Sequence, residues 1–350
     1  RTKPDGSYWN GSGCGNEFKS EAFMARKFLL DSLKYWTREY KADGFRFDLM
    51  ALIDGQTLDL LTSELKKIKP DIFIYGEPWA AGATPVKKLE KGGQRGRGFA
   101  VFNDNFRDAI KGSVFDLSKG YVQGGGISRD KVIKGIRGSV DDFTDSPLET
   151  INYVSCHDNH TLWDRIALST KGEASPAEQA RMDKLANALV LTSQGIPFLH
   201  SGEEFLRTKG FAENSYNLPD SVNKIDWALK EKNSAVFDYY RGLVALRRSH
   251  PAFRMKTADA ARKNLKFYEE LNLPVPGQCI AYVLDGAAAG DGWKKIIVLV
   301  NPSREPQRFA LPQGNFKKAA DANAVYPAGT GGFAGKFIAE PLSLSVLFEE

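Results

Sequence analysis

Up to about residue 254, short apolar runs alternate with longer stretches that have helical spacing. In the longer stretches apolar residues recur every three to five positions, which is typical of an amphipathic helix. Examples are Met24, Phe28, Leu33 and Trp36. The alternation of strand, loop and helix predicts parallel βα units. The apolar runs expected to be strands are residues 44–49, 72–76, 99–102, 151–155 and 196–200.

Helix ends are marked by capping residues and prolines. Pro70 ends one helix, Ser175 before Pro176 caps the start of another, and Pro251 ends a third. Five βα units are fewer than the eight of a closed (β/α)8 barrel, so an open five-stranded sheet is the alternative. The helices are expected at residues 21–40, 57–69, 176–193 and 233–250.

Beyond about residue 254 the helical spacing stops, and short alternating segments are separated by turn residues such as Asp285-Gly286. This pattern is typical of a small antiparallel β-domain, and we expect a sandwich. The sequence therefore predicts two domains, residues 1–255 and residues 256–350. The expected strands of the second domain are residues 265–268, 278–284, 295–300, 307–311 and 341–348.

Two predicted loops are unusually long, residues 138–150 and residues 202–227. Long loops in compact domains are usually functional or disordered. The second loop carries Tyr216 and Trp227 among several amides and acids, which favours a functional loop.

Composition excludes several classes of function. The net charge of +5 over 350 residues is mild and the basic residues do not form one face, so we expect no nucleic-acid partner. No segment approaches the roughly 20 apolar residues that span a bilayer, so we expect no membrane-spanning helix. Cys14, Cys156 and Cys279 are too scattered for a disulfide framework or a zinc site.

Carboxylates follow three of the predicted strands. Arg46 and Asp48 lie two positions apart at the end of the first, and therefore on one face of it. Glu77 and Trp79 follow the second, and the cluster that contains His157 and Asp158 follows the fourth. In parallel βα folds the reactive groups lie at these carboxyl ends of the strands.

Paired carboxylates without a nucleophilic serine or a cysteine–histidine pair indicate glycoside hydrolysis, which needs one nucleophile and one acid. Arg46 is expected to keep Asp48 ionised, and Trp79 to shield the Glu77 proton or to stack on a sugar. Each carboxylate alone also fits a helix cap. Together they also fit a magnesium site of a phosphate enzyme, although the chain shows no convincing phosphate-binding glycine loop. These residues do not identify the sugar.

Three segments resemble the signature regions of the α-amylase clan of glycoside hydrolases, in the right order. They are DGFRFD at 43–48, YGEPW at 75–79 and SCHDN at 155–159. Within the clan the chain is most similar to type I pullulanases. The further segments that carry this similarity are residues 102–112, 159–164, 201–209 and 214–216.

The resemblance implies a retaining hydrolase that cleaves α-1,6 branch links in pullulan, starch or glycogen-derived glucans. It implies that Asp48 attacks the anomeric carbon, Glu77 protonates the leaving oxygen, and Asp158 holds the distorted sugar. Arg46 and His157 would bind around the same glucose. No cofactor is required; the clan often uses calcium, but no ligand set in the sequence supports it. Weaker candidates for neighbouring sugar subsites are Trp79, Asn214 and Tyr216.

The clan's first signature region is missing from the chain, and so are the first three βα units. The five predicted strands therefore correspond to strands four to eight of a (β/α)8 barrel, with residues 1–20 as the loop after the third strand. A barrel without three strands has open edges, so we expect the N-terminal half of the enzyme as a non-covalent partner chain.

Three alternatives stay open beside the debranching hydrolase. The first is a glucan-binding fragment without turnover, and the second is an isoamylase-like or α-1,4-acting member of the clan. The third is the magnesium-dependent phosphate enzyme. The resemblance points to a bacterial protein, either secreted or cytoplasmic, and the sequence does not decide between the two.

Overall fold

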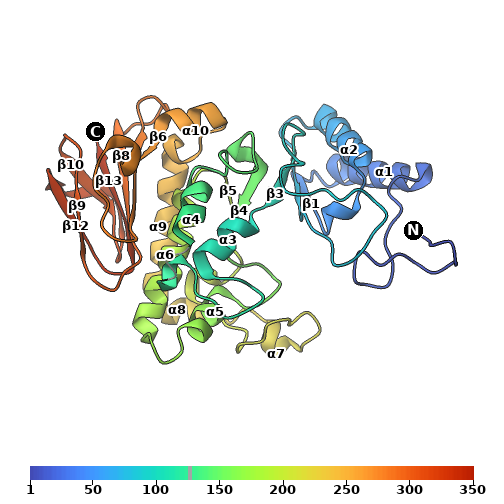
Figure 1. The fold of residues 1–350 in the computed structure, drawn as a ribbon, viewed down its shortest axis with the longest axis horizontal. Coiled ribbons are helices and arrows are strands. Elements are labelled where there is room, and N and C mark those ends of the chain that lie inside the picture. Colours follow the sequence, from blue (N-terminus) through green and yellow to red (C-terminus); the bar gives the residue numbers. More distant parts are fainter. Residues whose placement is uncertain (125–127) are drawn as a thin grey trace. The chain divides into compact units, whose positions relative to one another are not determined.

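The computed structural model describes residues 1–124 and 128–350. The chain forms two compact units, which we describe separately (Figure 1). The first unit contains Arg1–Phe102 and Asp142–Ile151, and the second contains Asn103–Asp141 and Asn152–Glu350. The boundary predicted at residue 255 divides the chain at a different place and stays a prediction.

The first unit is built on short parallel strands. β1 pairs in parallel with β2, placing Phe47 beside Gly76, and β2 pairs in parallel with β3. The strand order in the described part of the chain is β1-β2-β3-β4-β5, as predicted, and each strand is shorter than its apolar run. The strands of the first unit are β1 (Gly44–Phe47), β2 (Phe73–Gly76), β3 (Ala100–Phe102) and β4 (Thr150–Asn152), whose last residue is assigned to the second unit. β5 (Ile196–Pro197) belongs to the second unit.

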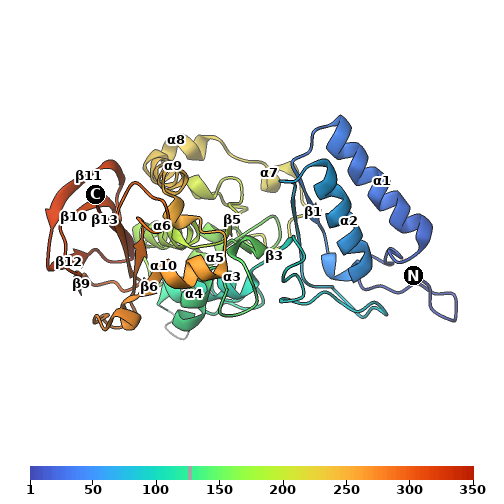
Figure 2. The ribbon, with the colours of Figure 1, turned by 90° about the horizontal axis from the view of Figure 1, so that it is seen from above.

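Two helices, α1 (Phe23–Glu39) and α2 (Gly55–Ile68), lie beside each other in the first unit (Figure 2). The Asp54 carboxylate caps α2 by accepting from the Thr57 N–H. The side chains of Leu58 and Leu65, seven residues apart on one helical face, are buried in the core. The short 3₁₀ helix η1 (Met50–Leu52) follows β1 and is buried as well.

The apolar side of α1 is mostly exposed, although its spacing correctly predicts a helix. Leu33 packs against the core of the first unit. Met24 and Phe28 are each 66% exposed, and they line a shallow hollow of about 400 Å³ on the helix surface. A large exposed apolar face of this kind is typical of an interaction surface. We call it the α1 face, defined by the exposed side chains of Phe23, Met24, Phe28, Tyr35, Trp36 and Tyr40.

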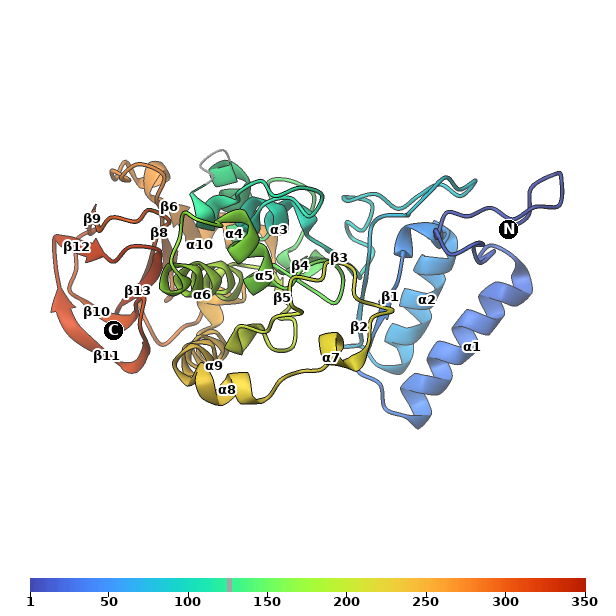
Figure 3. The same cartoon turned by 90° about the horizontal axis from the view of Figure 1, so that it is seen from below.

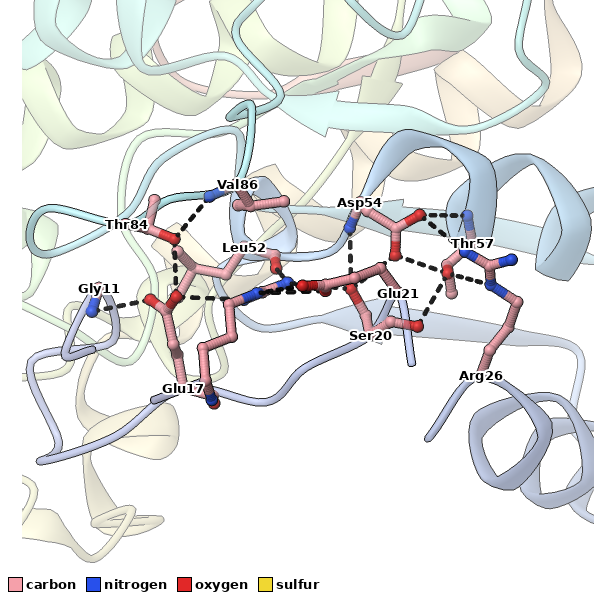
Figure 4. A network of polar contacts seen from close by, with 11 residues as sticks. Gly11, Glu17, Ser20, Glu21, Arg26, Leu52, Asp54, Thr57, Thr84 and Val86 are labelled. Atoms are coloured by element: carbon pink, nitrogen blue, oxygen red, sulfur yellow. Dashed lines mark hydrogen bonds and ion pairs between the residues drawn. The ribbon is translucent and has the colours of Figure 1, made fainter. Parts of the chain in front are cut away.

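A buried polar network fixes residues 1–21 onto the loops that follow β1 and β2 (Figure 4). The Arg1 guanidinium donates to the Glu17 carboxylate at 3.3 Å and to the Leu52 carbonyl at 3.1 Å. Glu17 also accepts from the Thr84 hydroxyl at 2.8 Å and from the Gly11 N–H at 2.9 Å. Because Leu52 follows β1 and Thr84 follows β2, the network connects both loops.

Helices form most of the second unit before residue 265, and α6 lies at its centre. Ser175 and Glu178 form a capping box at the start of α6, as Ser175 before Pro176 predicts. α6 packs against α9 and against strand β13 (Figure 3). The helices are α3 (Asp104–Lys111), α4 (Arg129–Ile136), α5 (Leu162–Ser169), α6 (Pro176–Thr192), α7 (Asp220–Asn223), α8 (Ala228–Lys232), α9 (Ser234–Ser249) and α10 (Ala258–Asn264).

Antiparallel strands form the rest of the second unit. In the described chain they make a six-stranded sheet, ordered β11-β10-β13-β8-β7-β6, and a two-stranded sheet of β12 and β9. Along β8, Val298 packs toward the helices, while Leu299 packs between the two sheets. The strands are β6 (Leu265–Phe267), β7 (Ile280–Asp285), β8 (Lys295–Asn301), β9 (Gln307–Ala310), β10 (Phe316–Ala320), β11 (Val325–Phe333), β12 (Lys336–Ala339) and β13 (Ser343–Glu349).

The fold class is the predicted one, a partial parallel barrel sheet followed by an antiparallel β-domain. Helical structure continues past residue 254, however, because Thr257 caps α10. The strands β10, β11 and β12 were not predicted from the sequence pattern. Among the described residues, no helix combines the length and the hydropathy needed to cross a membrane.

Candidate active site

Arg46 joins the two carboxylates that the first unit places at neighbouring strand ends. Its guanidinium donates to Asp48 Oδ1 at 2.9 Å and to Glu77 Oε1 at 2.5 Å. Asp48 and Glu77 come together because Phe47 of β1 is the register partner of Gly76 of β2. The prediction that Arg46 pairs with Asp48 is confirmed, and its second bond to Glu77 was not anticipated.

The two carboxylates differ in their surroundings. The Asp48 side chain is 71% exposed, whereas that of Glu77 is 6% exposed. Glu77 Oε2 also accepts from the Leu49 N–H at 2.9 Å. Leu49 has a left-handed backbone with φ 42°, an uncommon conformation for a leucine, and this turn directs its N–H toward Glu77.

This arrangement suits a nucleophile and an acid that act together. One guanidinium balances one of the two negative charges, so the pair carries a net charge of −1 when both carboxylates are ionised. Glu77 is the buried member of the pair, and its carboxyl oxygens accept from Arg46 and from the Leu49 N–H. Asp48 is exposed and can contact a substrate.

Trp79 is half-buried and packs at a tilt against Phe102, with 6.3 Å between the ring centroids. It therefore forms part of an aromatic wall after β2. This position fits either of the two predicted uses, a shield for the neighbouring carboxyl or a stacking surface for a sugar.

In the second unit, His157 and Asp158 follow β4 and are both exposed. His157 Nε2 lies 3.5 Å from Asp158 Oδ1, and the side chains are 60% and 51% exposed. The adjacent residue Ser155 is buried, and its hydroxyl donates to the Glu203 carboxylate. The exposed residues His157 and Asp158 are thus anchored to the second unit by the bond between Ser155 and Glu203.

Glu203 is a buried acid that sequence reasoning missed. Besides Ser155, its carboxylate accepts from the Asn187 amide and from the His200 N–H, both at 3.3 Å. Burial raises the pKa of Glu203 to about 7. Lys111, another buried charge of this unit, has a pKa lowered to about 8 by burial. Glu203 lies in the segment 201–209, one of the segments that resemble type I pullulanases, and this resemblance is the only feature of the sequence that could have pointed to it.

Asn214 and Tyr216 are exposed on both sides of a buried residue, Ser215. The Ser215 hydroxyl donates to Asn223 Oδ1 at 2.8 Å, and Asn223 Nδ2 donates back to the Ser215 carbonyl at 2.6 Å. Tyr216 is 81% exposed, so its ring is available to a ligand. The assignment of both residues to sugar subsites stays a prediction.

A group of candidate metal ligands coincides with the polar cluster. In the described residues, Cys156, His157 and Asp158 each offer one ligand atom, and these atoms lie within 4.8 Å of one another. Calcium takes six to eight oxygen ligands, and this set offers oxygen from one residue, so it fits calcium poorly. The expectation that no cofactor is required stays a prediction.

Comparison with known proteins relates the chain to pullulanases. A family model described as the pullulanase all-beta domain matches residues 262–324. The pullulanase of Bacillus subtilis is 40% identical over 313 residues, which cover 87% of this chain and 43% of that protein. The chain is a pullulanase homologue.

Solved pullulanase structures share its fold. The pullulanase from Bacillus acidopullulyticus is 44% identical, with a TM-score of 0.96, and the match covers all of this chain and 43% of that one. The pullulanase from Anoxybacillus, solved in complex with maltotetraose, is 38% identical with a TM-score of 0.92 over 50% of its length. The chain therefore spans half or less of these pullulanases.

Proposed function

We propose that this chain carries the catalytic carboxylates of a retaining debranching hydrolase that cleaves α-1,6 links in pullulan and related α-glucans. The observation that carries the proposal is the bridge of Arg46 between Asp48 and Glu77. Retaining glycosidases need two carboxyl groups only about 5–5.5 Å apart, and one guanidinium that contacts both keeps them close. The pullulanase relatives supply the substrate class.

In the proposed reaction an Asp48 oxygen attacks the anomeric carbon while Glu77 donates its proton to the departing glycosidic oxygen. The C–O bond breaks, the leaving glucan departs as an alcohol, and a glycosyl ester forms on Asp48. Glu77, now a carboxylate, then removes a proton from water, whose oxygen displaces Asp48. The Asp158 carboxylate binds hydroxyls of the distorted sugar in this scheme.

The test measures reducing-sugar release from pullulan, with linear amylose in parallel. The protein is this chain joined behind the N-terminal part of the Bacillus subtilis pullulanase, which we call the joined protein. Glu77→Gln should abolish the release of maltotriose, because an amide has no acidic proton. Glu90→Gln, the same exchange at an exposed glutamate of the first unit, should leave it unchanged.

Three results would contradict the proposal. Release from amylose but not from pullulan would favour an α-1,4-acting enzyme. Binding of maltotriose by a folded joined protein without release from either polymer would favour a glucan-binding protein. Hydrolysis unaffected by Glu77→Gln would remove Glu77 from the mechanism.

We further propose that a polypeptide equivalent to the N-terminal part of the relatives covers the α1 face. Phe28 and Trp36 are 66% and 46% exposed on this helix, and the relatives contain more than half of their length outside the match. When that N-terminal part and this chain are mixed as separate polypeptides, pullulan hydrolysis should appear. The same mixture with the Glu77→Gln chain should stay inactive. Binding without any effect on the exchange of α1 amide hydrogens would place the contact elsewhere.

A further inference from the structure

Lys209 is a buried lysine whose ammonium group holds the backbone on both sides of Asp158. Its Nζ donates to the His157 carbonyl at 3.1 Å and to the Asn159 carbonyl at 3.2 Å. The third bond goes to the Ser215 hydroxyl at 3.0 Å. An ammonium group has three N–H donors, so these acceptors use all of them.

The partners of Lys209 are unusual for a buried cation. The residue is 4% exposed, and among residues 1–124 and 128–350 its ammonium forms no ion pair with a carboxylate. Burial lowers the pKa of Lys209 and the positive charge of Arg207 lowers it further, while the more distant carboxylates of Asp158 and Asp164 offset only part of this effect. Burying a charge against neutral acceptors is costly, so this lysine is a poor choice for stability alone.

The backbone around Lys209 is fixed from a second direction by Asp164, in the first turn of α5. Asp164 is fully buried, and its Oδ2 accepts from the Lys209 N–H at 2.8 Å. Its Oδ1 accepts from the Thr208 hydroxyl at 2.5 Å. The ammonium therefore extends from a backbone that is itself held in place.

The turn that Lys209 contacts has a strained member. Asn159, directly after Asp158, has a left-handed backbone with φ 61°. Asparagine tolerates this conformation better than most residues, but it still needs support. The bond from Lys209 to the Asn159 carbonyl supplies support at this turn, and the turn sets the direction of the Asp158 side chain.

We propose that Lys209 is a positioning residue that orients Asp158 toward the substrate and couples it, through Ser215, to the loop that presents Asn214 and Tyr216. The inference rests on the proposed function, because it assigns Lys209 to the support of that same site. Lys209 thereby connects segments that are separate in the sequence, since it contacts residues 157 and 159 on one side and residue 215 on the other.

The first test needs no activity. Hydrogen exchange of the amides at residues 156–160 is measured in the joined protein with Lys209→Met, which keeps the length of the side chain and removes its donors. Exchange there should become at least about tenfold faster, because two carbonyls lose their partner. Lys224→Met, at an exposed lysine of the same loop, should not change it. Unchanged exchange in Lys209→Met overturns the inference whatever the enzyme does.

The second test separates positioning from general damage by a double-mutant cycle on pullulan hydrolysis. Lys209→Met should lower kcat per folded molecule by about a hundredfold, as expected when a reacting group is misplaced by about 1 Å. In an Asp158→Asn background, Lys209→Met should lower kcat by less than about threefold, because Lys209 acts through Asp158. Ser215→Ala removes the third bond of Lys209 together with the bond from the Ser215 hydroxyl to Asn223, and leaves both bonds to the turn in place. It should raise KM for pullulan and leave kcat within about twofold.

An equal loss in both backgrounds overturns the inference and makes Lys209 a structural residue. Wild-type joined protein that hydrolyses no glucan would instead contradict the proposed function, and the hydrogen-exchange result would still decide whether Lys209 holds the turn.

Discussion

The candidate site residues fall into two halves, one in the first unit and one in the second, and the two halves are built differently. In the first unit the functional side chains contact one another directly, because Arg46 bonds to both Asp48 and Glu77. In the second unit the Asp158 side chain is half exposed, and the buried Lys209 bonds to the main-chain carbonyls on both sides of it. Charge can therefore organise functional residues either by direct contact among the reacting groups or through the main chain that carries them.

Arg46→Met gives the largest of the effects expected from this comparison. The exchange removes the cation between two carboxylates, so kcat/KM for pullulan should fall by about a hundred- to a thousandfold in the joined protein. Arg38→Met, at an exposed arginine near the end of α1, should leave kcat/KM unchanged. A loss of less than about tenfold for Arg46→Met would mean that the first half does not depend on the direct bridge.

In the second half, Glu203 should make stability depend on pH. Its pKa is about 7 in the folded protein, compared with an ordinary value of 4.5 for this side chain, so the folded state binds more protons than the unfolded state between these two pH values. The stabilising contribution is therefore present below about pH 4.5 and is lost as pH rises through about 7. The loss should reach roughly 3 kcal/mol at pH 8, given about 1.4 kcal/mol per pKa unit.

The measurement is urea unfolding at pH 5 to 8 for wild type and Glu203→Gln. As pH rises, the free energy of unfolding of the wild type should fall relative to that of Glu203→Gln, because glutamine does not titrate. Glu231→Gln, at an exposed glutamate, should show no such shift relative to wild type. A pH-independent difference for Glu203→Gln would show that this carboxyl stays ionised throughout.

The smallest effect concerns the polar network under the first half. A methyl group at Gly11 would lie 2.3 Å from Glu17 Oε2 and 2.8 Å from Leu52 Cδ2. Gly11→Ala should lower the free energy of unfolding by about 1–2 kcal/mol, since the buried Glu17 has little freedom to move. The measurement is thermal unfolding of wild type and both variants. Gly292→Ala, where the added methyl group meets open space, should leave the melting temperature unchanged. Equal melting temperatures would show that the network tolerates displacement of Glu17.

Strands and long helices were predictable from the sequence because their signals are local. All five parallel strands and the helices α1, α2, α6 and α9 form where apolar runs, helical spacing and end residues place them. The segment that forms β11 reads VYPAGTGGF, which has low strand propensity, and pairing with β10 makes it a strand. The seven residues of α10 are too few to show a helical period.

The sequence alone shows which carboxylates belong to which strand ends, since Asp48, Glu77 and Asp158 each lie at or shortly after the end of an apolar run. What surrounds these carboxylates depends on the tertiary structure. Arg46 reaches Glu77 only because β1 and β2 pair in a particular register, and Lys209 contacts residues 157 and 159 from some fifty positions away. A buried charge in a loop has no periodic signal, because its burial depends on contacts between distant segments.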